Sequence, residues 1–490
     1  MSPRLTDLAD LPGDIARPRY IPGDHRPGIV HLGLSAFHKA HQAVYTDDAL
    51  AAAGGDWRIT GVSLRNVEPS QELTPQNGLY TVIERGAAGS TARIVGAIAQ
   101  ALCLKTDRPA VLAALVAPET RIVSLTVTEK GYGLDRATGG IDRTHPAIIA
   151  DLEHPAEPQG VAGLLVWALG QRKAAGLAPF TILCCDNLPE NGSLVRGLLI
   201  DFARHAAPAL TEHIDNTVAF PATMVDRITP ARGPETLALA GRMIGRRDEA
   251  AVETETFRQW VIEDDFPTGR PAWEAGGAIF VKEVRAYEEM KLRMLNGSHS
   301  MLAYTGFLCG HSYVRDVMRE SALGSMIQLH LAAAAVTLSP LLSVDLDVYA
   351  RDLLDRFTNP HLAHETYQIA MDGTEKLPQR IFAPAVDALR AGQPIDAFAF
   401  ATAAWMRYAL GRQDDGAAYD LRDPRQSAIS AALSDSAAPE EIVGRLVDLP
   451  GFCPSELSTC PAWNNAVASR LSSIMELGMR DAVDREISTS

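Results

Sequence analysis

The first half of the sequence alternates short runs rich in valine, isoleucine and leucine with segments of helical pattern. Runs of strand character lie at 28–34, 57–64, 92–98, 121–129 and 180–187, and a clear helical pattern covers 160–176. Continuous apolar runs separated by helices are typical of parallel strands that are buried on both faces. The sequence therefore predicts an α/β domain built on a mainly parallel sheet.

After about residue 287 the strand pattern gives way to alanine-, leucine- and methionine-rich segments with helical spacing. We place the boundary within 280–287, so that an α/β domain covers residues 1–284 and an all-α domain covers 285–490. We expect the ligand site in a cleft between two such domains.

Charge and composition limit the partners. The 490 residues contain 45 Lys and Arg against 60 Asp and Glu, a net charge of −15, which argues against nucleic acid or an anionic membrane as the main partner. The start of the chain is charged and does not resemble a signal peptide, and no apolar run is long enough to span a membrane. The 6 cysteines lack zinc-site spacing, so we expect free thiols, no metal and a cytoplasmic location.

A glycine turn follows the first predicted strand, in the segment HLGLSAFHKAH. A dinucleotide site uses glycine at such a turn because the backbone must bend and approach a pyrophosphate. Gly33 fits this need, but Ser35 stands at the second glycine position, so a plain buried turn remains the alternative. His38 and Lys39 are candidate phosphate contacts, or ordinary surface residues.

The end of the second predicted strand is where a ribose-binding group is expected. Glu68 favours the free 2′-hydroxyl of NAD, whereas Arg65 could accommodate the 2′-phosphate of NADP. Both are otherwise read as exposed loop charges.

The strongest chemical pattern is MKLRMLNGSHS, which opens the helical half. On a helix Asn296 and His299 are neighbours and Lys291 lies on an adjoining part of the face. An ammonium, an amide and an imidazole suit proton transfer at a ketone or alcohol oxygen. Lysine serves if cations such as Arg293 or a protonated His299 lower its pKa; a surface lysine beside core residues is the alternative.

Three further segments contribute candidates. Asn187 follows a strand and could donate its amide to a substrate oxygen, although CDNLPENG also suits a turn. Asp226 stands beside Arg227 and could form a structural ion pair instead of a site. Lys376 and Arg380 suit a carboxylate or polyhydroxylated ligand, unless they are solvated loop charges.

Seven blocks in order resemble the long-chain mannitol dehydrogenase family: IVHLGLSAFHKAHQAVYTDD, SLTVTEKGY, CDNLPENG, MVDRITP, FRQWVIEDDF, MKLRMLNGSHS and QIAMDGTEKLPQR. The resemblance implies a Rossmann-like N-terminal domain, a helical C-terminal domain, NAD(H), no catalytic metal, and a monomer or loose homo-oligomer. It implies that Lys291 is the general acid/base, that Asn187 and Asn296 hold the substrate oxygen, and that His299 orients the substrate or the lysine. Further contacts implied are Asp226, Lys376, Lys130, Gln368 and Arg380 for the substrate, and Gly33, Ser35, Phe37, His38, Lys39, Arg65 and Glu68 for the cofactor.

The sequence departs from mannitol dehydrogenases at three places. Ser35 replaces a glycine, Gln368 stands where they have arginine, and Lys130 stands where they tend to have glycine. TEKGY and MDGTEKLPQR look more like the fructuronate reductase branch, and a second lysine near the site suits a uronate carboxylate. We therefore expect reduction of a keto-hexuronate to an aldonate. The alternatives are oxidation of mannitol, arabinitol or sorbitol, and an idle sugar- or NAD-binding protein.

Overall fold

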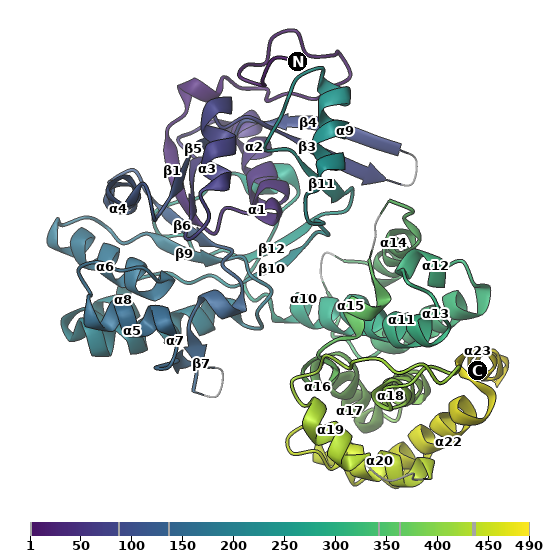
Figure 1. The fold of residues 1–490 in the computed structure, drawn as a ribbon. Coiled ribbons are helices and arrows are strands. Elements are labelled where there is room, and N and C mark those ends of the chain that lie inside the picture. Colours follow the sequence, from purple (N-terminus) through teal and green to yellow (C-terminus); the bar gives the residue numbers. More distant parts are fainter. Residues whose placement is uncertain are drawn as a thin grey trace. The chain divides into compact units, whose positions relative to one another are not determined.

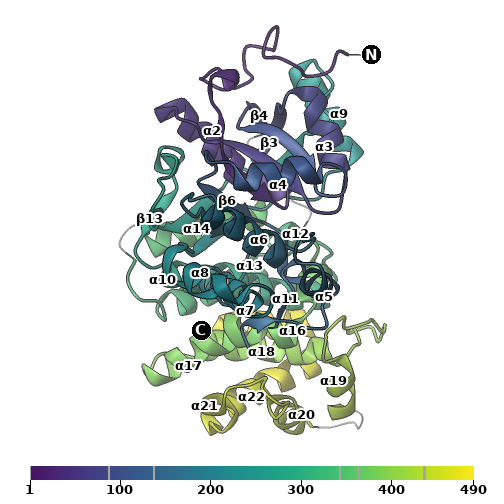
Figure 2. The ribbon, with the colours of Figure 1, turned by 90° about the vertical axis from the view of Figure 1, so that its left-hand side faces the viewer.

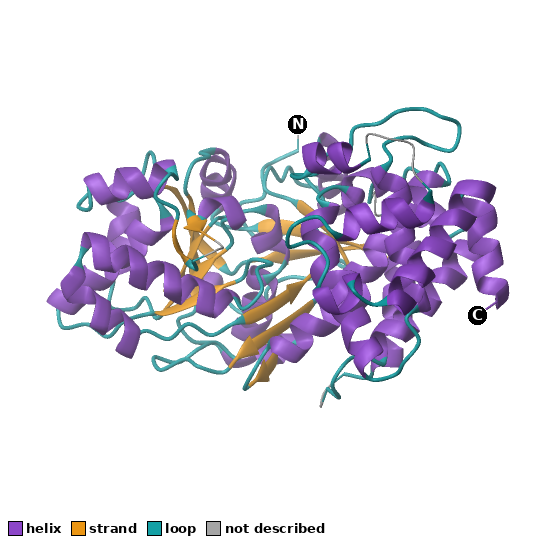
Figure 3. Ribbon diagram, turned by 90° about the horizontal axis from the view of Figure 1, so that it is seen from below, coloured by secondary structure: helices purple, strands orange, loops and turns teal. Residues whose placement is uncertain are grey.

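The computed structural model describes residues 2–86, 89–135, 138–341, 344–361, 364–433 and 438–489. The chain forms two compact units, Met1–Arg285 and Ala286–Ser490, here called unit 1 and unit 2. Strands, orange in Figure 3, occur in unit 1, and every regular element described in unit 2 is helical.

The main sheet of unit 1 has five parallel strands in the order β5-β2-β1-β6-β9. The strands are β1 (Pro27–Leu32), β2 (Arg58–Ser63), β5 (Ile98–Cys103), β6 (Ile122–Leu125) and β9 (Thr181–Cys184). Their side chains are almost entirely buried, as expected of a parallel sheet covered on both faces. The predicted α/β class is confirmed in this sheet.

Helices cover both faces of the sheet. One core packs the sheet against α4 (Arg108–Val116), α5 (Pro146–Glu153), α6 (Val161–Ala174), α7 (Asn191–Ala206) and α8 (Thr211–Thr217). Helices α6, α7 and α8 lie side by side in Figures 1 and 2. The opposite core contains α2 (Gln42–Ala53), with α1 (Ala36–Ala40) leading into it. The other α-helices described within this unit are α3 (Glu68–Leu73) and α9 (Pro234–Ile244).

Smaller sheets complete unit 1. They contain β11 (Val252–Glu255), β3 (Tyr80–Gly86) and β4 (Gly89–Val95); β10 (Thr223–Asp226), β12 (Gln259–Glu263) and β13 (Ile279–Val281); and β7 (Leu134–Asp135) with β8 (Gly140–Ile141). The prediction that residues 92–98 form one strand was wrong. These residues span the end of β4 and the start of β5. The break lies at Gly96, whose backbone N–H donates to Asp47 Oδ1 at 2.9 Å instead of continuing a strand ladder.

Unit 2 is a helical domain, as its composition predicts. It contains α10 (Arg285–Met290), α11 (Gly297–Leu308), α12 (Val314–Val317), α13 (Ser321–Ala335), α14 (Leu346–Thr358), α15 (Thr366–Ala370), α16 (Gly373–Leu377), α17 (Ala383–Arg390), α18 (Asp396–Ala409), α19 (Gln426–Ala432), α20 (Pro439–Val447), α21 (Ser455–Ser458), α22 (Pro461–Leu477) and α23 (Met479–Thr489). Two π-helical segments interrupt it, η6 (Lys291–Asn296) and η7 (Pro378–Phe382). Helix α11 packs against α13, α15 and α18.

Each unit has its own buried aromatic cluster. In unit 1 the rings of Trp260 and Trp273 lie 4.7 Å apart. In unit 2 Trp405 lies 4.8 Å from Phe452, and Trp463 is fully buried. The 6 cysteines are unpaired, and none of the helices in the described ranges is long and apolar enough to cross a membrane.

Candidate active site

The turn after β1 requires glycine at position 33. Gly33 has φ +106°, and a Cβ there would lie 2.0 Å from the Thr126 carbonyl oxygen. The N–H groups of Gly33 and Leu34 both donate to the Val62 carbonyl, at 2.8 and 3.1 Å. The bend therefore needs a residue that has neither a side chain nor a preference for negative φ.

Ser35 is compatible with the turn and supports it. Its backbone is extended, with φ −134° and ψ 175°, so the position has no need of glycine's conformational freedom. Its hydroxyl accepts the His38 N–H at 3.3 Å and caps α1. The serine thus fills a structural role at the start of a short helix.

This turn lies at the point where the strand order reverses. Strand β1 pairs with β2 on one side and with β6 on the other, and the chain passes through β2 and β5 before returning to β6. Open α/β sheets bind dinucleotides in the crevice beside such a switch point. Arg65 and Glu68 are exposed after β2, where a ribose-binding group is expected. These residues fit a dinucleotide.

Three neighbours of the turn point into the protein. The His38 ring is fully buried and stacks on His31 at 3.5 Å. Lys39 is 5 % exposed, and its Nζ donates to the Ala250 carbonyl at 2.8 Å. Phe37 stacks on His41 at 5.0 Å. The expectation that His38 and Lys39 contact phosphate is therefore corrected, because both side chains are committed to the core.

A hydrogen-bond network joins the ends of β6, β9 and β10. Asp186, just after β9, accepts the N–H groups of Val127 and Thr128 at 2.9 and 3.1 Å. Asn191 Nδ2 donates to the carbonyls of Asp186 and Thr223 at 3.1 and 2.8 Å. Three expected site residues gather at these strand ends, namely Lys130, Asn187 and Asp226. Lys130 and Asn187 are exposed, whereas Asp226 is buried.

Arg227, beside Asp226, is part of the scaffold. Its guanidinium forms an ion pair with Glu84 at 2.5 Å and donates to the carbonyls of Ala40 and Glu255. It thereby ties β10 to the small sheet and to the end of α1.

In unit 2 the π-helical turn η6 brings the lysine and the asparagine onto one face. Lys291 and Asn296 are five residues apart, which at about 100° per residue would place them roughly 140° apart on an α-helix. A π-helix bonds residue i to residue i+5, so the two stand one turn apart along the same side. Such turns are frequent at functional sites. His299 follows within the first turn of α11.

Two polar groups on this face have spare hydrogen-bonding capacity. Asn296 Nδ2 and His299 Nε2 are buried and have no hydrogen-bond partner among the described residues. Burial lowers the pKa of His299 well below its usual value, and His364, Arg356, Arg380 and Lys291 lower it further. His299 is therefore neutral near pH 7.

The cations expected to activate Lys291 are not available for that role. His299 carries no charge, and Arg293 pairs with Asp387 at 2.7 Å while donating to the Thr337 carbonyl, also at 2.7 Å.

Arg356 and His364 were missed by sequence reasoning, because a cation in the amphipathic helix α14 and a histidine before α15 look like ordinary surface residues. His364 lies with its ring 5.4 Å from that of His299.

The second π-helical segment, η7, packs against η6. Arg380 in η7 donates through Nη1 to the Asn296 carbonyl at 3.4 Å and to Ser300 Oγ at 3.3 Å. Within the described ranges it forms no ion pair with a carboxylate. Burial lowers its pKa to about 10. Arg380 therefore has N–H groups left to donate, and it lies in the same region as Asn296 Nδ2 and His299 Nε2.

The other two expected substrate contacts in this unit are placed differently. Lys376 Nζ donates to the carbonyls of Met371 and Ile369 at 2.6 and 3.3 Å, and lies 3.7 Å from Asp372. Lys376 thus stabilises the turn that precedes α16, the helix to which it belongs. Gln368 lies exposed on α15.

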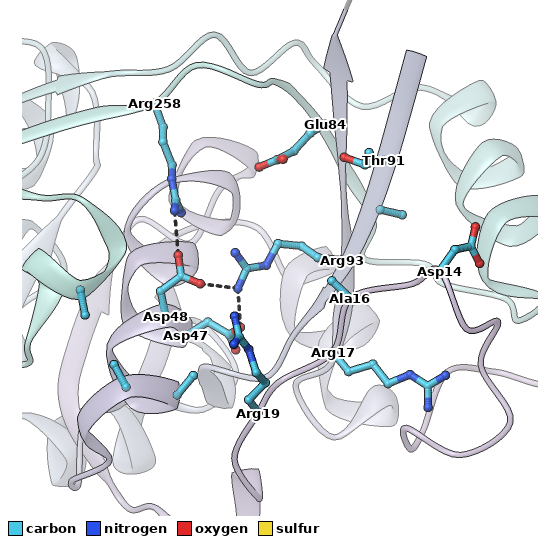
Figure 4. Close-up of a pocket in the computed structure, with 14 residues that line it drawn as sticks. Asp14, Ala16, Arg17, Arg19, Asp47, Asp48, Glu84, Thr91, Arg93 and Arg258 are labelled. Carbon is cyan, nitrogen blue, oxygen red and sulfur yellow. Dashed lines mark hydrogen bonds and ion pairs between the residues drawn. The ribbon is translucent and has the colours of Figure 1, made fainter. Parts of the chain in front are cut away.

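A pocket of about 660 Å³ in unit 1 lies apart from these residues. Figure 4 shows Arg93 reaching Asp47 and Asp48, with Arg258 also paired to Asp48, at distances of 2.7, 2.7 and 2.8 Å. The charges of Arg93 and Arg258 are thus balanced by these two carboxylates. The pocket contains none of the site residues expected from the sequence.

Comparison with known proteins gives a consistent result. Residues 27–275 match the family model for the mannitol dehydrogenase Rossmann domain, and residues 283–475 match the model for the mannitol dehydrogenase C-terminal domain. The chain is 40 % identical to the D-mannonate oxidoreductase of Escherichia coli, over 98 % of this chain and 99 % of that protein. It is also 40 % identical to the mannitol 2-dehydrogenase of Cereibacter sphaeroides, over 96 % and 97 %.

A solved structure is similar over the whole length. The mannitol 2-dehydrogenase of Pseudomonas fluorescens, in a ternary complex with NAD and D-mannitol, matches with a TM-score of 0.84 at 34 % identity. The match covers 100 % of both chains.

Proposed function

Because the chain belongs to the mannitol dehydrogenase family, we propose that it reduces a keto-hexuronate to an aldonate, in the manner of D-fructuronate to D-mannonate. The family makes it an NAD-dependent oxidoreductase acting on a secondary alcohol group. This confirms the family resemblance, the fold class and the cofactor expected from the sequence. The reading as an idle binding protein is set aside on the same ground.

The cofactor contacts we propose lie on the switch-point side of the main sheet. Gly33 would let the backbone approach the pyrophosphate, Ser35 keeps the start of α1 formed, and Arg65 and Glu68 would bind the ribose. When bound, NADH supplies a hydride equivalent to the carbonyl carbon. His38 and Lys39 would support this surface from beneath rather than touch the cofactor.

Proton transfer is assigned to Lys291. In the direction of reduction its ammonium gives a proton to the substrate oxygen as the carbonyl becomes an alcohol. The amides of Asn296 and Asn187 donate hydrogen bonds to that oxygen, where negative charge develops. Neutral His299 orients the substrate through Nε2, the nitrogen that has no partner within the described chain. Asp226 contacts a sugar hydroxyl.

The observation that supports a charged substrate is Arg380. A guanidinium withdrawn from water with no carboxylate in contact is unfavourable; the more distant Asp372 acts on Arg380 but lies against Lys376. A ligand carboxylate would supply the direct pairing. A neutral hexitol offers no such group. Lys376 is already bound to backbone carbonyls, so we assign the substrate carboxylate to Arg380. Lys130, which is exposed in unit 1, is proposed as a further cation for the same substrate.

A polyol dehydrogenase is the second candidate. It is favoured by the relatives that act on mannitol and by the complex of the Pseudomonas fluorescens protein with D-mannitol. The two functions share the fold, NAD and the proton-transfer lysine, so only the substrate distinguishes them.

NADH oxidation with D-fructuronate, D-tagaturonate and D-fructose, and NAD reduction with D-mannonate, mannitol, arabinitol and sorbitol, tests the proposal. We expect turnover of a keto-uronate with kcat/KM at least 100-fold above that for fructose. In Arg380→Met the KM for the keto-uronate should rise at least tenfold, and in the matched variant Lys376→Met it should rise less. Equal or better turnover of fructose and mannitol by the wild type would assign the chain to the polyol branch.

A further inference from the structure

Thr128 has a backbone conformation that a β-branched residue rarely adopts. Its φ is +65° and its ψ is 157°, in a region occupied almost only by glycine. The residue lies between the end of β6 and the short turn Glu129–Gly131 that carries Lys130. Strain of this kind persists only where the surroundings enforce it.

The enforcing group is the carboxylate of Asp186. Oδ1 accepts the N–H of Thr128 at 3.1 Å, and Oδ2 accepts the N–H of Val127 at 2.9 Å. A third donor, the Tyr132 hydroxyl, reaches Oδ2 at 2.7 Å. The carboxylate therefore fixes the peptide unit that carries the Thr128 N–H. On the other side of Thr128, His145 Nε2 donates to the Lys130 carbonyl at 3.1 Å, so the segment that contains the positive φ is held at both ends.

Asp186 also lies next to the proposed substrate amide. Its own carbonyl accepts the N–H of Leu188 at 2.9 Å and Asn191 Nδ2 at 3.1 Å, so the backbone on both sides of Asn187 is fixed. One residue thus ties the end of β6 to the end of β9, with Lys130 on one side of the tie and Asn187 on the other.

We propose that Asp186 is a positioning residue, which holds Thr128 in its strained conformation so that the turn bearing Lys130 and the amide of Asn187 keep a fixed arrangement. The residue acts through the backbone and does not itself touch the substrate. The inference rests on the proposed function in one respect, the assignment of Asn187 and Lys130 to the substrate side.

Glycine at position 128 separates this role from ordinary stabilisation. Glycine adopts φ +65° freely, so a chain with Thr128→Gly no longer depends on Asp186 to reach that conformation. If Asp186 acts by imposing the conformation, glycine restores part of the activity lost with the carboxylate. If Asp186 merely stabilises the fold, adding Thr128→Gly lowers the activity of the Asp186 variant further.

The experiment compares Asp186→Ala, Thr128→Gly and the double variant in the full-length enzyme. Tyr132→Phe is the matched control, because it removes one hydrogen bond from the same carboxylate without freeing Thr128. We expect Asp186→Ala to lower kcat/KM at least tenfold, Thr128→Gly and Tyr132→Phe to stay within about threefold of wild type, and the double variant to recover at least threefold over Asp186→Ala. A double variant as slow as Asp186→Ala, or an Asp186→Ala variant within twofold of wild type, would overturn the proposal.

Thermal unfolding supplies a second measurement if Asp186→Ala does not fold. Thr128→Gly should leave the midpoint unchanged or raise it, because it relieves strain, whereas Glu129→Gly in the adjacent helical turn should lower it. A drop of similar size in both variants would contradict the strained role. The assays use whichever substrate the wild type turns over, so this proposal and the keto-uronate proposal fail separately.

Discussion

Gly297 faces the backbone of Arg380 across a gap that has no room for a side chain. A Cβ at position 297 would lie 3.0 Å from the Arg380 carbonyl oxygen and 2.7 Å from His330 Nε2. A glycine in mid-helix lowers helix stability by about 1 kcal/mol relative to alanine. The close packing of η6 on η7 is what this glycine makes possible, and it brings Arg380 beside Asn296.

Replacing Gly297 by alanine should therefore destabilise the protein, against helix propensity. We expect a loss of about 1–3 kcal/mol from overpacking against a backbone carbonyl, and a fall in kcat because η6 is displaced. The control is Gly324→Ala in α13, where a Cβ meets its nearest atom at 3.8 Å and alanine should be neutral or stabilising. Thermal unfolding of both variants checks this, and equal midpoints would contradict it.

Lys291→Ala should reduce turnover by about 10²–10⁴-fold, because the proton donor at the substrate oxygen is lost. NADH affinity, measured by fluorescence titration, should stay close to that of the wild type. Near-normal turnover in this variant would show that another group transfers the proton.

His38 makes the stability of unit 1 sensitive to acid. Burial lowers the pKa of His38 well below its usual 6.5, so below pH 6.5 the unfolded chain binds a proton that the folded chain does not. Stability is therefore lost as the pH falls, by up to about 1.4 kcal/mol per pH unit. His38→Leu lacks the titrating group. Measured by urea unfolding, the free energy of unfolding of His38→Leu should therefore rise relative to that of the wild type by about 2 kcal/mol as the pH falls from 6.5 to 5. A pH-independent difference would refute the explanation.

Lys39 makes the stability of the protein depend on pH in the alkaline range. Burial lowers the pKa of Lys39 from 10.5 to about 8, so between these values the folded chain has lost a proton that the unfolded chain keeps. The free energy of unfolding of the wild type should rise relative to Lys39→Met by about 3 kcal/mol over this interval. Urea unfolding at pH 7.5 and pH 10.5 measures this change. The same difference in free energy of unfolding between wild type and Lys39→Met at both pH values would mean that the ammonium is not buried in solution.

The order of elements followed from the sequence because burial on two faces leaves a direct pattern. Continuous apolar runs predicted the strands at 28–34, 57–64 and 180–187, close to β1, β2 and β9. The prediction for the run 92–98 was wrong because β4 and β5, which are separated only by Gly96 and Ala97, form one apolar stretch.

The site was predicted less completely, for two physical reasons. Periodicity assumes a uniform helix, and the π-turn at η6 changes the angle between Lys291 and Asn296 without altering composition. Burial of polar residues is also invisible in one sequence: His38 and Lys39 look like surface residues, yet they are held in the core by His31 and the Ala250 carbonyl.

The separate tryptophan clusters make the chain suited to fluorescence spectroscopy. Trp260 and Trp273 lie in unit 1, and Trp405 and Trp463 lie in unit 2, all of them buried. Replacing Trp405 and Trp463 by phenylalanine leaves indole emission from unit 1 alone. Replacing Trp260 and Trp273 together with the other two tryptophans of unit 1, Trp57 and Trp167, leaves indole emission from unit 2 alone. Urea titrations of the two variants would then show whether the two units unfold in one transition or in two. Repeating them with NADH would show whether the cofactor stabilises one unit selectively.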